Sequence, residues 1–311
     1  MPPQHTGAPR VAVIVLNWNG TDDTIECLQS LMRVDYPRCE IIVVDNGSRE
    51  SPRARIAAEF PTVTYLQTAH NLGYAGGNNV GIRHALAHGH DYVFVLNNDT
   101  IVEPDFLTHA VAVAESDAAI GVVGIKIMAW DQPGHVWVAY GRVTYRQSLI
   151  GLVGYYEPDD GRYDQQCDVD WVPGTAMLFS RRALECVGLF DEAFFAYHED
   201  VDWCTLARER GFRVVFAPGA RIHHKGHRSS GGKGYVTPRQ YLGGRNMVLF
   251  VRKHARWYQT LRFVAFQLAT LPLQYLRRSF TGEQRGVVLK VRGMLDACRG
   301  RPLPLEELGF R

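Results

Sequence analysis

The sequence predicts an α/β fold with a mostly parallel central sheet flanked by helices, plus a C-terminal helical extension. In the first half of the chain, short apolar runs rich in β-branched residues alternate with helical patterns. Three of these runs lead into clusters of polar residues, as expected at the ends of strands that line a ligand cleft. After about residue 236, three helical patterns follow one another without a strand between them.

Four strands and two helices are expected in the first half. Aliphatic and β-branched residues place the strands at 11–16, 41–44, 63–66 and 92–96. Helical spacing of apolar residues places helices at 21–33 and 75–88, the second beginning in a glycine-rich run. Parallel strands need such crossover helices between them.

The second half is less regular after a helix that starts near Pro104. Residues 120–170 contain a strand-like piece at 136–145 and an acidic loop around Asp159, and no further order is assigned there. Regular elements return as a strand at 172–179, helices at 181–187 and 199–210, and a strand at 214–217. Three further helices are expected at 238–254, 257–278 and 284–299.

Charge divides the chain into two regions. Residues 1–220 carry 16 Lys and Arg against 28 Asp and Glu, whereas residues 221–311 carry 18 against 4. The basic module suits phosphate groups or an anionic membrane surface. Nucleic acid is not expected, because no helix-turn-helix, zinc-finger or RNA-binding signature accompanies the charge.

The start of the chain and its cysteines favour a cytoplasmic protein. Residues 1–10 lack the apolar stretch of a signal peptide. The six cysteines include no CxxC pair, which argues against a zinc knuckle and a disulfide framework. We interpret them as buried, reduced thiols.

The polar cluster at residues 96–100, Leu-Asn-Asn-Asp-Thr, follows the fourth apolar strand. A carboxylate at this place, Asp99, can bind a hard divalent cation that bridges two phosphate oxygens, because Mg²⁺ and Mn²⁺ complete their coordination shells from the substrate. An aspartate that only caps the next turn is the alternative.

A second cluster places Glu199, Asp200 and Asp202 at the start of a predicted helix. Carboxylates stabilise a helix N-terminus by roughly 0.3–1 kcal/mol each, which is one explanation for them. Three acids exceed that need. A carboxylate beside an acceptor hydroxyl would act as a general base, an effect of roughly a hundred- to ten-thousand-fold in rate.

A histidine cluster follows the strand expected at 214–217. His223, His224 and His227 offer imidazole nitrogens as metal ligands, and the cations Lys225 and Arg228 would neutralise a phosphate leaving group. The spacing does not decide which histidine serves.

The glycine-rich run at 71–81 lacks the GxGxxG spacing of a dinucleotide fingerprint. It also follows the third strand rather than the first. A Rossmann dehydrogenase is therefore disfavoured.

The order of these motifs along the chain resembles that of glycosyltransferase family 2, which has the GT-A fold. The matching segments lie between residue 11 and about residue 229: VLNWN, VVDNGS, NLGYAGGNNVG, LNNDT, PGTAML, HEDVDWC and the histidine-containing strand end. The segment YLGGRNMVLFVR at 241–252 is similar to the rhamnosyltransferase-like branch. The resemblance implies a GT-A catalytic domain at 1–235, with a nucleotide-sugar half at about 1–118 and an acceptor half at about 119–235, and a helical module at 236–311.

The resemblance also implies an activity. The enzyme would transfer a sugar with inversion, assisted by Mn²⁺ or Mg²⁺, in polysaccharide or glycolipid assembly. The donor would be a dTDP- or UDP-sugar, with dTDP-rhamnose favoured, and the acceptor a saccharide or a lipid-linked saccharide. A catalytically silent sugar-nucleotide-binding scaffold and a nucleotidyltransferase are the alternatives.

Donor contacts are implied for Asn17, Asp45, Asn71, Asn79, Asn97, Asn98, Lys225 and Arg228. Within this set, Asn17 and Asp45 would hold the nucleobase. Asn97 and Asp99 match the two ends of the family's DxD-type motif, but the first position is Asn here. Only Asp99 is therefore expected to bind the metal from this motif.

Acceptor contacts are implied for Gly174, Thr175, Asp202 and Trp203. Asp200 matches the catalytic base of the family, and Glu199 would orient the base or the acceptor. His224 fits the metal-binding histidine best, with His223 as the second choice.

The predicted helix at 257–278 has a broad apolar face. Arg262 and Pro272 disfavour a transmembrane span. The helix would either lie in the interface of an anionic membrane, anchored by Trp257 and Tyr258, or pack on the catalytic domain or a second subunit. A peripheral position on the inner face of the cell membrane and a homodimer thus both stay open.

Overall fold

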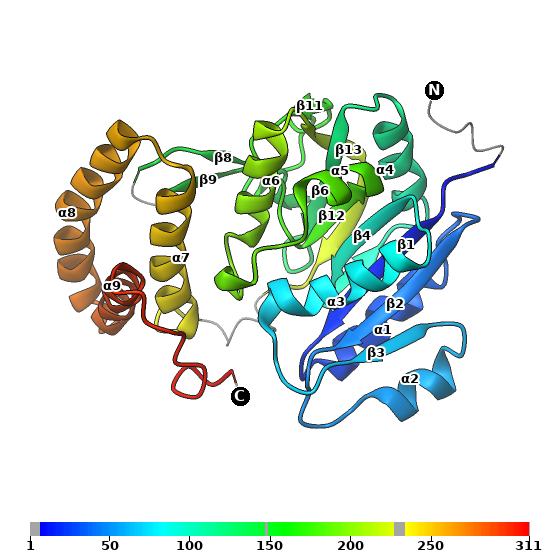
Figure 1. Ribbon diagram of the computed structural model, residues 1–311, viewed down its shortest axis with the longest axis horizontal. Coiled ribbons are helices and arrows are strands. Elements are labelled where there is room, and N and C mark those ends of the chain that lie inside the picture. The colour runs from blue at the N-terminus through cyan, green and yellow to red at the C-terminus, as the bar shows by residue number, and fades with distance from the viewer. Residues whose placement is uncertain (1–6, 147–148, 227–233, 311) are drawn as a thin grey trace.

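The computed structural model describes residues 7–146, 149–226 and 234–310 and has an α/β architecture with one large mixed sheet (Figure 1). Four strands of its first half are mutually parallel: β1 (Val11–Asn17), β2 (Cys39–Asp45), β3 (Thr64–Gln67) and β4 (Tyr92–Asn97). They lie in the order β4-β1-β2-β3, so the ends of β1, β2 and β4 are neighbours. The predicted strands are confirmed to within two residues at each end.

Three helices connect these strands: α1 (Thr21–Leu31), α2 (Arg53–Glu59) and α3 (Gly73–Ala87). In α1, Ile25, Leu28 and Leu31 recur at helical spacing and are buried against the sheet. The short α2 was not expected from the sequence. It buries only Ile56, so it carries almost no amphipathic signal.

The second half extends the same sheet. Its main strands are β6 (Ile120–Ala129), β12 (Ala176–Ser180) and β13 (Arg213–His224). Strand β12 runs antiparallel to both β4 and β6, and β13 runs parallel to β6. The end of β13 also pairs with the short β5 (Thr100–Val102), which places the histidines of β13 beside the polar end of β4.

Two sequence interpretations are corrected here. The strand expected at 214–217 continues to His224, with a register shift between Ala217 and Arg221 where Pro218 and Gly219 interrupt the pairing. The segment 120–170 is more ordered than expected, because it begins with the fully buried β6. It continues with β7 (His135–Val138), β8 (Tyr140–Val143), β9 (Ile150–Val153), β10 (Glu157–Pro158) and β11 (Cys167–Asp168).

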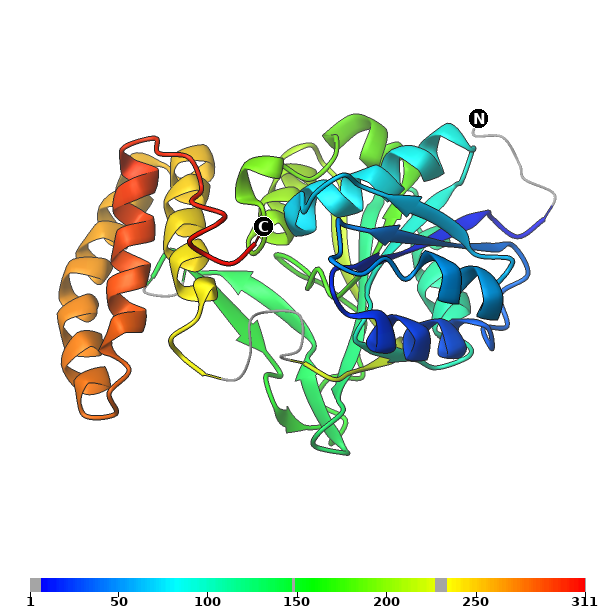
Figure 2. The same ribbon diagram turned by 90° about the horizontal axis from the view of Figure 1, so that it is seen from below.

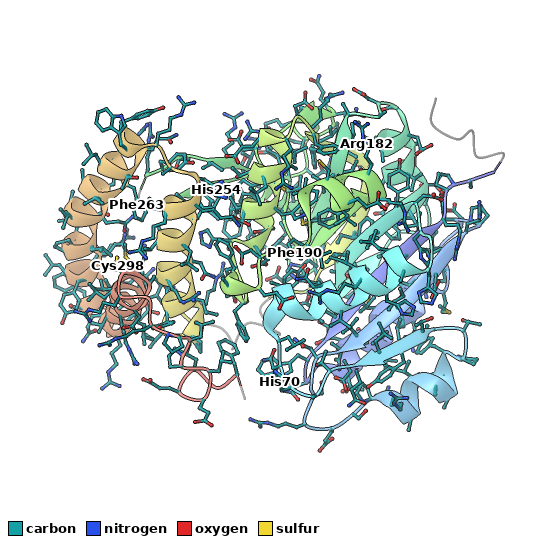
Figure 3. The ribbon with its side chains drawn as sticks, in the orientation of Figure 1. His70, Arg182, Phe190, His254, Phe263 and Cys298 are labelled. Atoms are coloured by element: carbon teal, nitrogen blue, oxygen red, sulfur yellow. The ribbon has the colours of Figure 1, made fainter. Side chains whose placement is uncertain are left out.

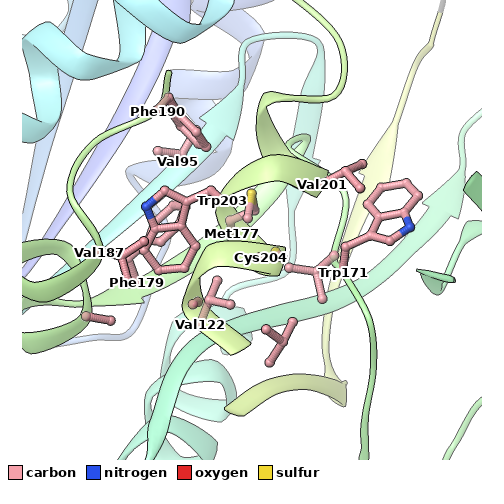
Figure 4. Close-up of a cluster of buried hydrophobic side chains, with 14 of the residues drawn as sticks. Val95, Val122, Trp171, Met177, Phe179, Val187, Phe190, Val201, Trp203 and Cys204 are labelled. Atoms are coloured by element: carbon pink, nitrogen blue, oxygen red, sulfur yellow. The ribbon is translucent and has the colours of Figure 1, made fainter. Parts of the chain in front are cut away.

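Helices cover both faces of the sheet and enclose the core. They include α4 (Phe106–Glu115), α5 (Arg181–Val187) and α6 (Glu199–Glu209), with a short 3₁₀ turn, η1 (Glu192–Phe194), before α6. Figure 4 shows Trp203 and Cys204 of α6 among apolar side chains from the sheet. Trp203 meets Phe179 edge to face at 4.6 Å. This packing fixes α6, and therefore its N-terminal carboxylates, against β12.

The helical module consists of α7 (Pro238–His254), α8 (Trp257–Ser279) and α9 (Gln284–Cys298). Helices α7 and α9 are in close contact at two glycines: a Cβ on Gly244 would lie 2.1 Å from Lys290 O, and one on Gly293 2.1 Å from Tyr241 O. Figures 1 and 2 show α8 on the outside of the molecule, with α7 nearer the catalytic domain. Within the described residues, no helix combines the length and apolarity that crossing a bilayer requires.

All six cysteines are free, but they are not all buried. Cys27 and Cys204 are enclosed, whereas Cys186 and Cys298 are exposed. The expectation of uniformly buried thiols was therefore wrong. Cys39 and Cys167 are half-buried. Helix-end positions explain the two exposed cysteines, since both lie in the last turn of a helix.

Candidate active site

The ends of β1 and β2 are joined by a buried polar network. Asn17 Nδ2 donates to Asp45 Oδ1 at 3.2 Å, and Asn17 Oδ1 accepts from Thr24 Oγ1 at 2.9 Å. Tyr65 donates its hydroxyl to Asp45 Oδ2 at 2.9 Å. Because Asn17 and Asp45 are both fully buried, these bonds hold the two strand ends in one arrangement.

The loop before α3 is held by Asn46, a residue that the sequence analysis did not single out. Its Nδ2 donates to Asn71 Oδ1 and to Gly73 O, each at 3.0 Å. Gly73 has φ +75°, and a Cβ there would lie 2.4 Å from Phe195 O. Only glycine fits this position, so the glycine-rich run serves a close approach of two backbones.

Asn79 lies inside the protein on α3. Its Nδ2 donates to Phe190 O at 2.9 Å and to Glu192 Oε1 at 3.0 Å, and its Oδ1 accepts from Phe190 N at 3.0 Å. The side chain therefore holds the segment that leads to η1 and α6. Figure 3 labels Phe190 beside α3.

At the end of β4, the side chain of Asn98 and the backbone of Asn97 are hydrogen-bonded to neighbouring segments. Asn98 Nδ2 donates to Gly20 O at 3.2 Å and Thr24 Oγ1 at 3.0 Å, which ties β4 to the start of α1. The backbone N of Asn97 donates to Thr175 O at 3.0 Å. Asp99 remains, and it faces β13.

Asp99 and His224 form a buried pair. His224 Nε2 lies 3.2 Å from Asp99 Oδ1, with exposed fractions of 6% and 1%. Burial alone would raise the pKa of the Asp99 carboxyl, but the close approach and charge of His224 outweigh it, so the pKa is lowered. The His224 ring also packs edge to face on Trp137, with centroids 4.3 Å apart.

This pair fits a divalent cation. Both oxygens of Asp99 and Nδ1 of His224 are buried and form no hydrogen bond of good geometry with the described residues. The described residues contain no group of three or more His, Cys, Asp and Glu side chains suited to a metal. A carboxylate and an imidazole would leave most coordination positions to substrate oxygens and water, which is how Mg²⁺ commonly binds.

His223 lies on the other side of β13, as expected for adjacent strand residues. Its Nε2 is 3.5 Å from Glu103 Oε1, and the side chain is partly exposed. Of the two histidines, only His224 neighbours Asp99. His227 and Arg228 fall outside the described residues.

Asp200 stands at the start of α6, facing residues 173–175. Its Oδ2 accepts from Gly174 N at 2.9 Å, and its Oδ1 accepts from Val201 N at 2.8 Å. Burial nevertheless raises the pKa of Asp200 to about 6. Burial and then the charge of Asp200 raise the pKa of neighbouring Glu199 well above its usual range. Burial thus disfavours the charged form of both carboxyls, and the charge of Asp200 adds to this effect at Glu199.

Tyr74 is a site residue that sequence reasoning missed. Its hydroxyl donates to Gly174 O, which fixes the backbone whose N–H meets Asp200. Burial, then the charges of Glu199 and Asp200, and also that of Asp99, raise its pKa. The only sequence signal was an aromatic residue inside the glycine-rich run.

The separate pieces converge at one edge of the sheet. Residues 173–175 connect them, since Thr175 O accepts from the strand end that carries Asp99 and Gly174 N donates to Asp200. Tyr74 is within electrostatic reach of both carboxylates. Asp45 joins the same edge through the parallel register of β1 with β2 and β4.

A family model described as "Glycosyltransferase like family 2" matches residues 9–260. The chain belongs to glycosyltransferase family 2.

The relatives of this glycosyltransferase include rhamnosyltransferases. It is 27% identical over 303 residues to the N-acetylglucosaminyl-diphospho-decaprenol L-rhamnosyltransferase of Mycobacterium tuberculosis, covering 90% of this chain and 92% of the relative. It is 24% identical to the dTDP-rhamnosyl transferase RfbF of Shigella flexneri, covering 74% and 77%. A hexosyltransferase of low-salt glycan biosynthesis from Haloferax volcanii is 25% identical, covering 68% of this chain and 66% of the relative.

Solved structures support the GT-A fold. The mannosyltransferase PcManGT from Pyrobaculum calidifontis, in complex with GDP-Man and Mn²⁺, superposes with a TM-score of 0.61 at 19% identity, covering 93% of this chain and 88% of that chain. This likeness establishes the shared fold, as the sequence predicted.

Two predicted acceptor residues of the glycosyltransferase are enclosed. Asp202 Oδ2 accepts from Lys253 Nζ at 2.9 Å, and its Oδ1 lies 2.7 Å from His254 Nε2. Figure 3 labels His254 on α7, the helix that these contacts join to α6. Trp203 Nε1 donates to Gly188 O at 2.8 Å within the core. Neither side chain is open to an acceptor in this arrangement, whereas Gly174 and Thr175 lie beside Asp200.

The Lys225 side chain also forms ion pairs within the protein. Its Nζ donates to Asp23 Oδ1 at 3.0 Å and to Glu26, both on α1. Its backbone N donates to Asp99 O at 2.9 Å. The ammonium thus ties β13 to α1, and donor contact would require it to leave these carboxylates.

Asn246 of α7, in the helical module, holds the backbone segment that leads into α6 and Asp200. Its Nδ2 faces three carbonyls at 2.7–2.8 Å, those of Phe194, Ala196 and Tyr197. Tyr197 and His198, which directly precede α6, both have positive φ. The amide therefore stabilises a costly backbone conformation that sets where α6, and so Asp200, begins.

Proposed function

We propose that this chain is an inverting glycosyltransferase that moves a hexose from a nucleoside diphosphate sugar to an acceptor hydroxyl. The observation that supports the proposal is that residues 173–175 are hydrogen-bonded both to Asp200 and to the strand end that leads to Asp99, the neighbour of His224. A general base and a cation site at one strand edge suit attack on a carbon whose leaving group is a diphosphate.

In this mechanism, Asp200 takes the proton from the acceptor hydroxyl. Its carboxylate is fixed by the N–H groups of Gly174 and Val201, which leaves lone pairs free for the incoming proton. A pKa of about 6 makes it mostly ionised at neutral pH and more basic than an ordinary aspartate. The oxygen then attacks the anomeric carbon from the side opposite the diphosphate, so the configuration inverts.

Asp99 and His224 would hold Mn²⁺ or Mg²⁺, and the cation supplies Lewis-acid stabilisation of the diphosphate leaving group. Burial and the charge of Asp200 raise the pKa of Glu199, and in its protonated form Glu199 would donate a hydrogen bond that orients the acceptor or the base. Tyr74 keeps the backbone of Gly174 in place for that step.

On the donor side, the buried Asn17–Asp45 network would form the floor of the nucleobase site. The Asp45 carboxylate can accept from a pyrimidine N3–H where it now accepts from Tyr65. Two relatives whose names specify rhamnosyl transfer favour dTDP-rhamnose, with UDP-sugars next. The name of the mycobacterial relative also favours a lipid-linked saccharide as acceptor.

Product analysis tests the proposed reaction. The protein is incubated with Mn²⁺, a panel of nucleotide sugars and a lipid-linked acceptor, and the nucleotide products are separated. Release of nucleoside diphosphate with inverted linkage is expected. Release of pyrophosphate would indicate a nucleotidyltransferase, and binding without either product would indicate a catalytically silent scaffold.

The outer face of α8 favours attachment to an anionic membrane. Of its 23 residues only Phe263 and Gln267 are buried. Trp257, Leu261, Val264, Leu268 and Tyr275 recur at helical spacing on one face and are 45–75% exposed. The helix contains three arginines and no Asp or Glu.

Such an exposed apolar surface needs a partner. The arginines complement anionic lipid, and Trp257 with Tyr258 suits the interface region of a bilayer. We therefore propose that α8 lies flat on the cytoplasmic side of the cell membrane, where it would bring the active site to a lipid-linked acceptor. A second copy of the chain is the competing occupant of this face.

A further inference from the structure

Residues 303–310 return from the helical module to the nucleotide half of the catalytic domain. Figures 1 and 2 show this segment, coloured red, leaving α9 and approaching the domain. Glu307 forms a two-pronged ion pair with Arg292 of α9, and Leu308 is buried in a cluster with Phe195 and Tyr241. The segment is therefore docked along its length.

The end of the segment contacts Asn71 and Trp18, which lie in loops near the ends of the parallel strands. Asn71 Nδ2 donates to Phe310 O at 3.1 Å, although 239 positions separate the two residues. The Phe310 ring lies 5.9 Å from the ring of Trp18 and 5.2 Å from that of Phe195, centroid to centroid. Phe310 thus joins the loop after β1 to the loop before α3.

Those two loops adjoin the proposed nucleobase site. Trp18 directly follows Asn17, whose amide is bonded to Asp45. Asn71 accepts from Asn46, which directly follows Asp45. Trp18 and Phe310 are both half-buried, so two aromatic rings remain partly open beside a polar strand edge. Partly exposed aromatic rings at such a place are suited to stacking on a base.

We propose that residues 303–310 form one wall of the donor pocket and that Phe310 contacts the nucleoside of the donor. This inference rests on the proposed function, because it assumes a nucleotide at the ends of β1 and β2. It adds a donor-binding residue from outside the GT-A domain. The helical module then contributes to donor affinity as well as to the packing of α6.

The test compares binding of dTDP and of inorganic pyrophosphate, each with Mn²⁺, by titration calorimetry. Loss of one base contact weakens binding roughly ten-fold. For Phe310→Ala we therefore expect about ten-fold weaker dTDP binding and unchanged pyrophosphate binding, because pyrophosphate would engage only the Asp99–His224 end. Phe310→Tyr keeps the ring and should restore dTDP affinity.

Met32→Ala provides the matched control, since Met32 is 44% exposed and directly follows the C-terminal end of α1, at the opposite edge of the sheet. Equal dTDP affinity of Phe310→Ala and wild type would overturn the inference alone. Tighter binding by the variant would also overturn it, because the segment would then block the pocket. Parallel weakening of dTDP and pyrophosphate would indicate a structural role only. Failure of the wild-type protein to bind dTDP or UDP would remove the proposed function as well.

Discussion

The candidate site around Asp99, His224 and Asp200 and the outer face of α8 depart from ordinary protein surfaces in opposite ways. At the candidate site, carboxylates and an imidazole are buried, and several of their atoms lack partners among the described residues. On α8, large apolar side chains are exposed. Both departures cost free energy in the isolated chain, and a ligand reduces the cost in each case. We propose that this ligand is substrate with a cation in the first region and lipid in the second.

The largest effect is expected for Asp200→Asn, which tests whether this buried carboxylate acts as the base. Removing the base should lower kcat roughly a hundred- to ten-thousand-fold, while the affinity for the nucleotide stays nearly constant. The measurement is steady-state transfer alongside calorimetric binding of dTDP. Asp160→Asn serves as the control, because Asp160 is an exposed carboxylate that pairs with Arg162. Full transfer by Asp200→Asn would remove Asp200 from the mechanism.

Substitution of His223 and of His224 tests which of the two histidines binds the proposed cation. His224→Ala should weaken Mn²⁺-dependent dTDP binding by at least about ten-fold, since it removes one of the two proposed protein ligands. His223→Ala should leave that binding unchanged, because its side chain lies near Glu103. Asp99→Ala should behave like His224→Ala. Equal effects at both histidines would contradict the assignment.

The acid side of the pH profile tests the buried carboxylate. The raised pKa of Asp200 means that the base is lost to protonation as the pH falls through about 6, rather than near the ordinary value of 3.8. We expect kcat to fall about ten-fold per pH unit below that point. A constant kcat down to about pH 5 would show that the rate-limiting step does not use this group.

The smallest expected effect concerns α8. Leu268→Glu places a charge on a side chain that is 71% exposed, and it should reduce cosedimentation with phosphatidylglycerol vesicles about ten-fold. Leu152→Glu, at a 41% exposed position on β9, is the matched control. Transfer to a soluble acceptor should not change. Equal vesicle binding of the two variants, or self-association of wild type that Leu268→Glu disrupts, would favour a protein partner.

Local patterns predicted the four strands of the first half, most helices and the three polar clusters, but they missed β6 and placed the start of β12 four residues too early. Apolar β-branched runs and helical spacing depend only on near neighbours in sequence, so they could be recognised. Strand β13 was predicted too short, because Pro218 and Gly219 break the apolar pattern although pairing with β6 resumes at Arg221. The family resemblance added the order of the motifs.

Long-range contacts could not be predicted in the same way. Asn46, Tyr74 and Asn246 act through partners up to 100 positions away, and polar residues of these types are common in loops and helices. Asp202 and Trp203 lie beside Asp200 in sequence, but helical geometry turns them toward α7 and the core. Sequence adjacency to the proposed base therefore did not place these two side chains at the candidate site.

The contact between α6 and α7 makes the catalytic domain depend on the helical module. Among the residues that the structure describes, the almost wholly enclosed carboxylate of Asp202 forms its ion pairs with Lys253 and His254 of the module. A chain shortened after β13 would leave that charge without compensation, at a penalty of about 3–5 kcal/mol, and would free the backbone that Asn246 holds. Engineering that exchanges acceptor preference between relatives should therefore move α6 and α7 together as one inherited unit.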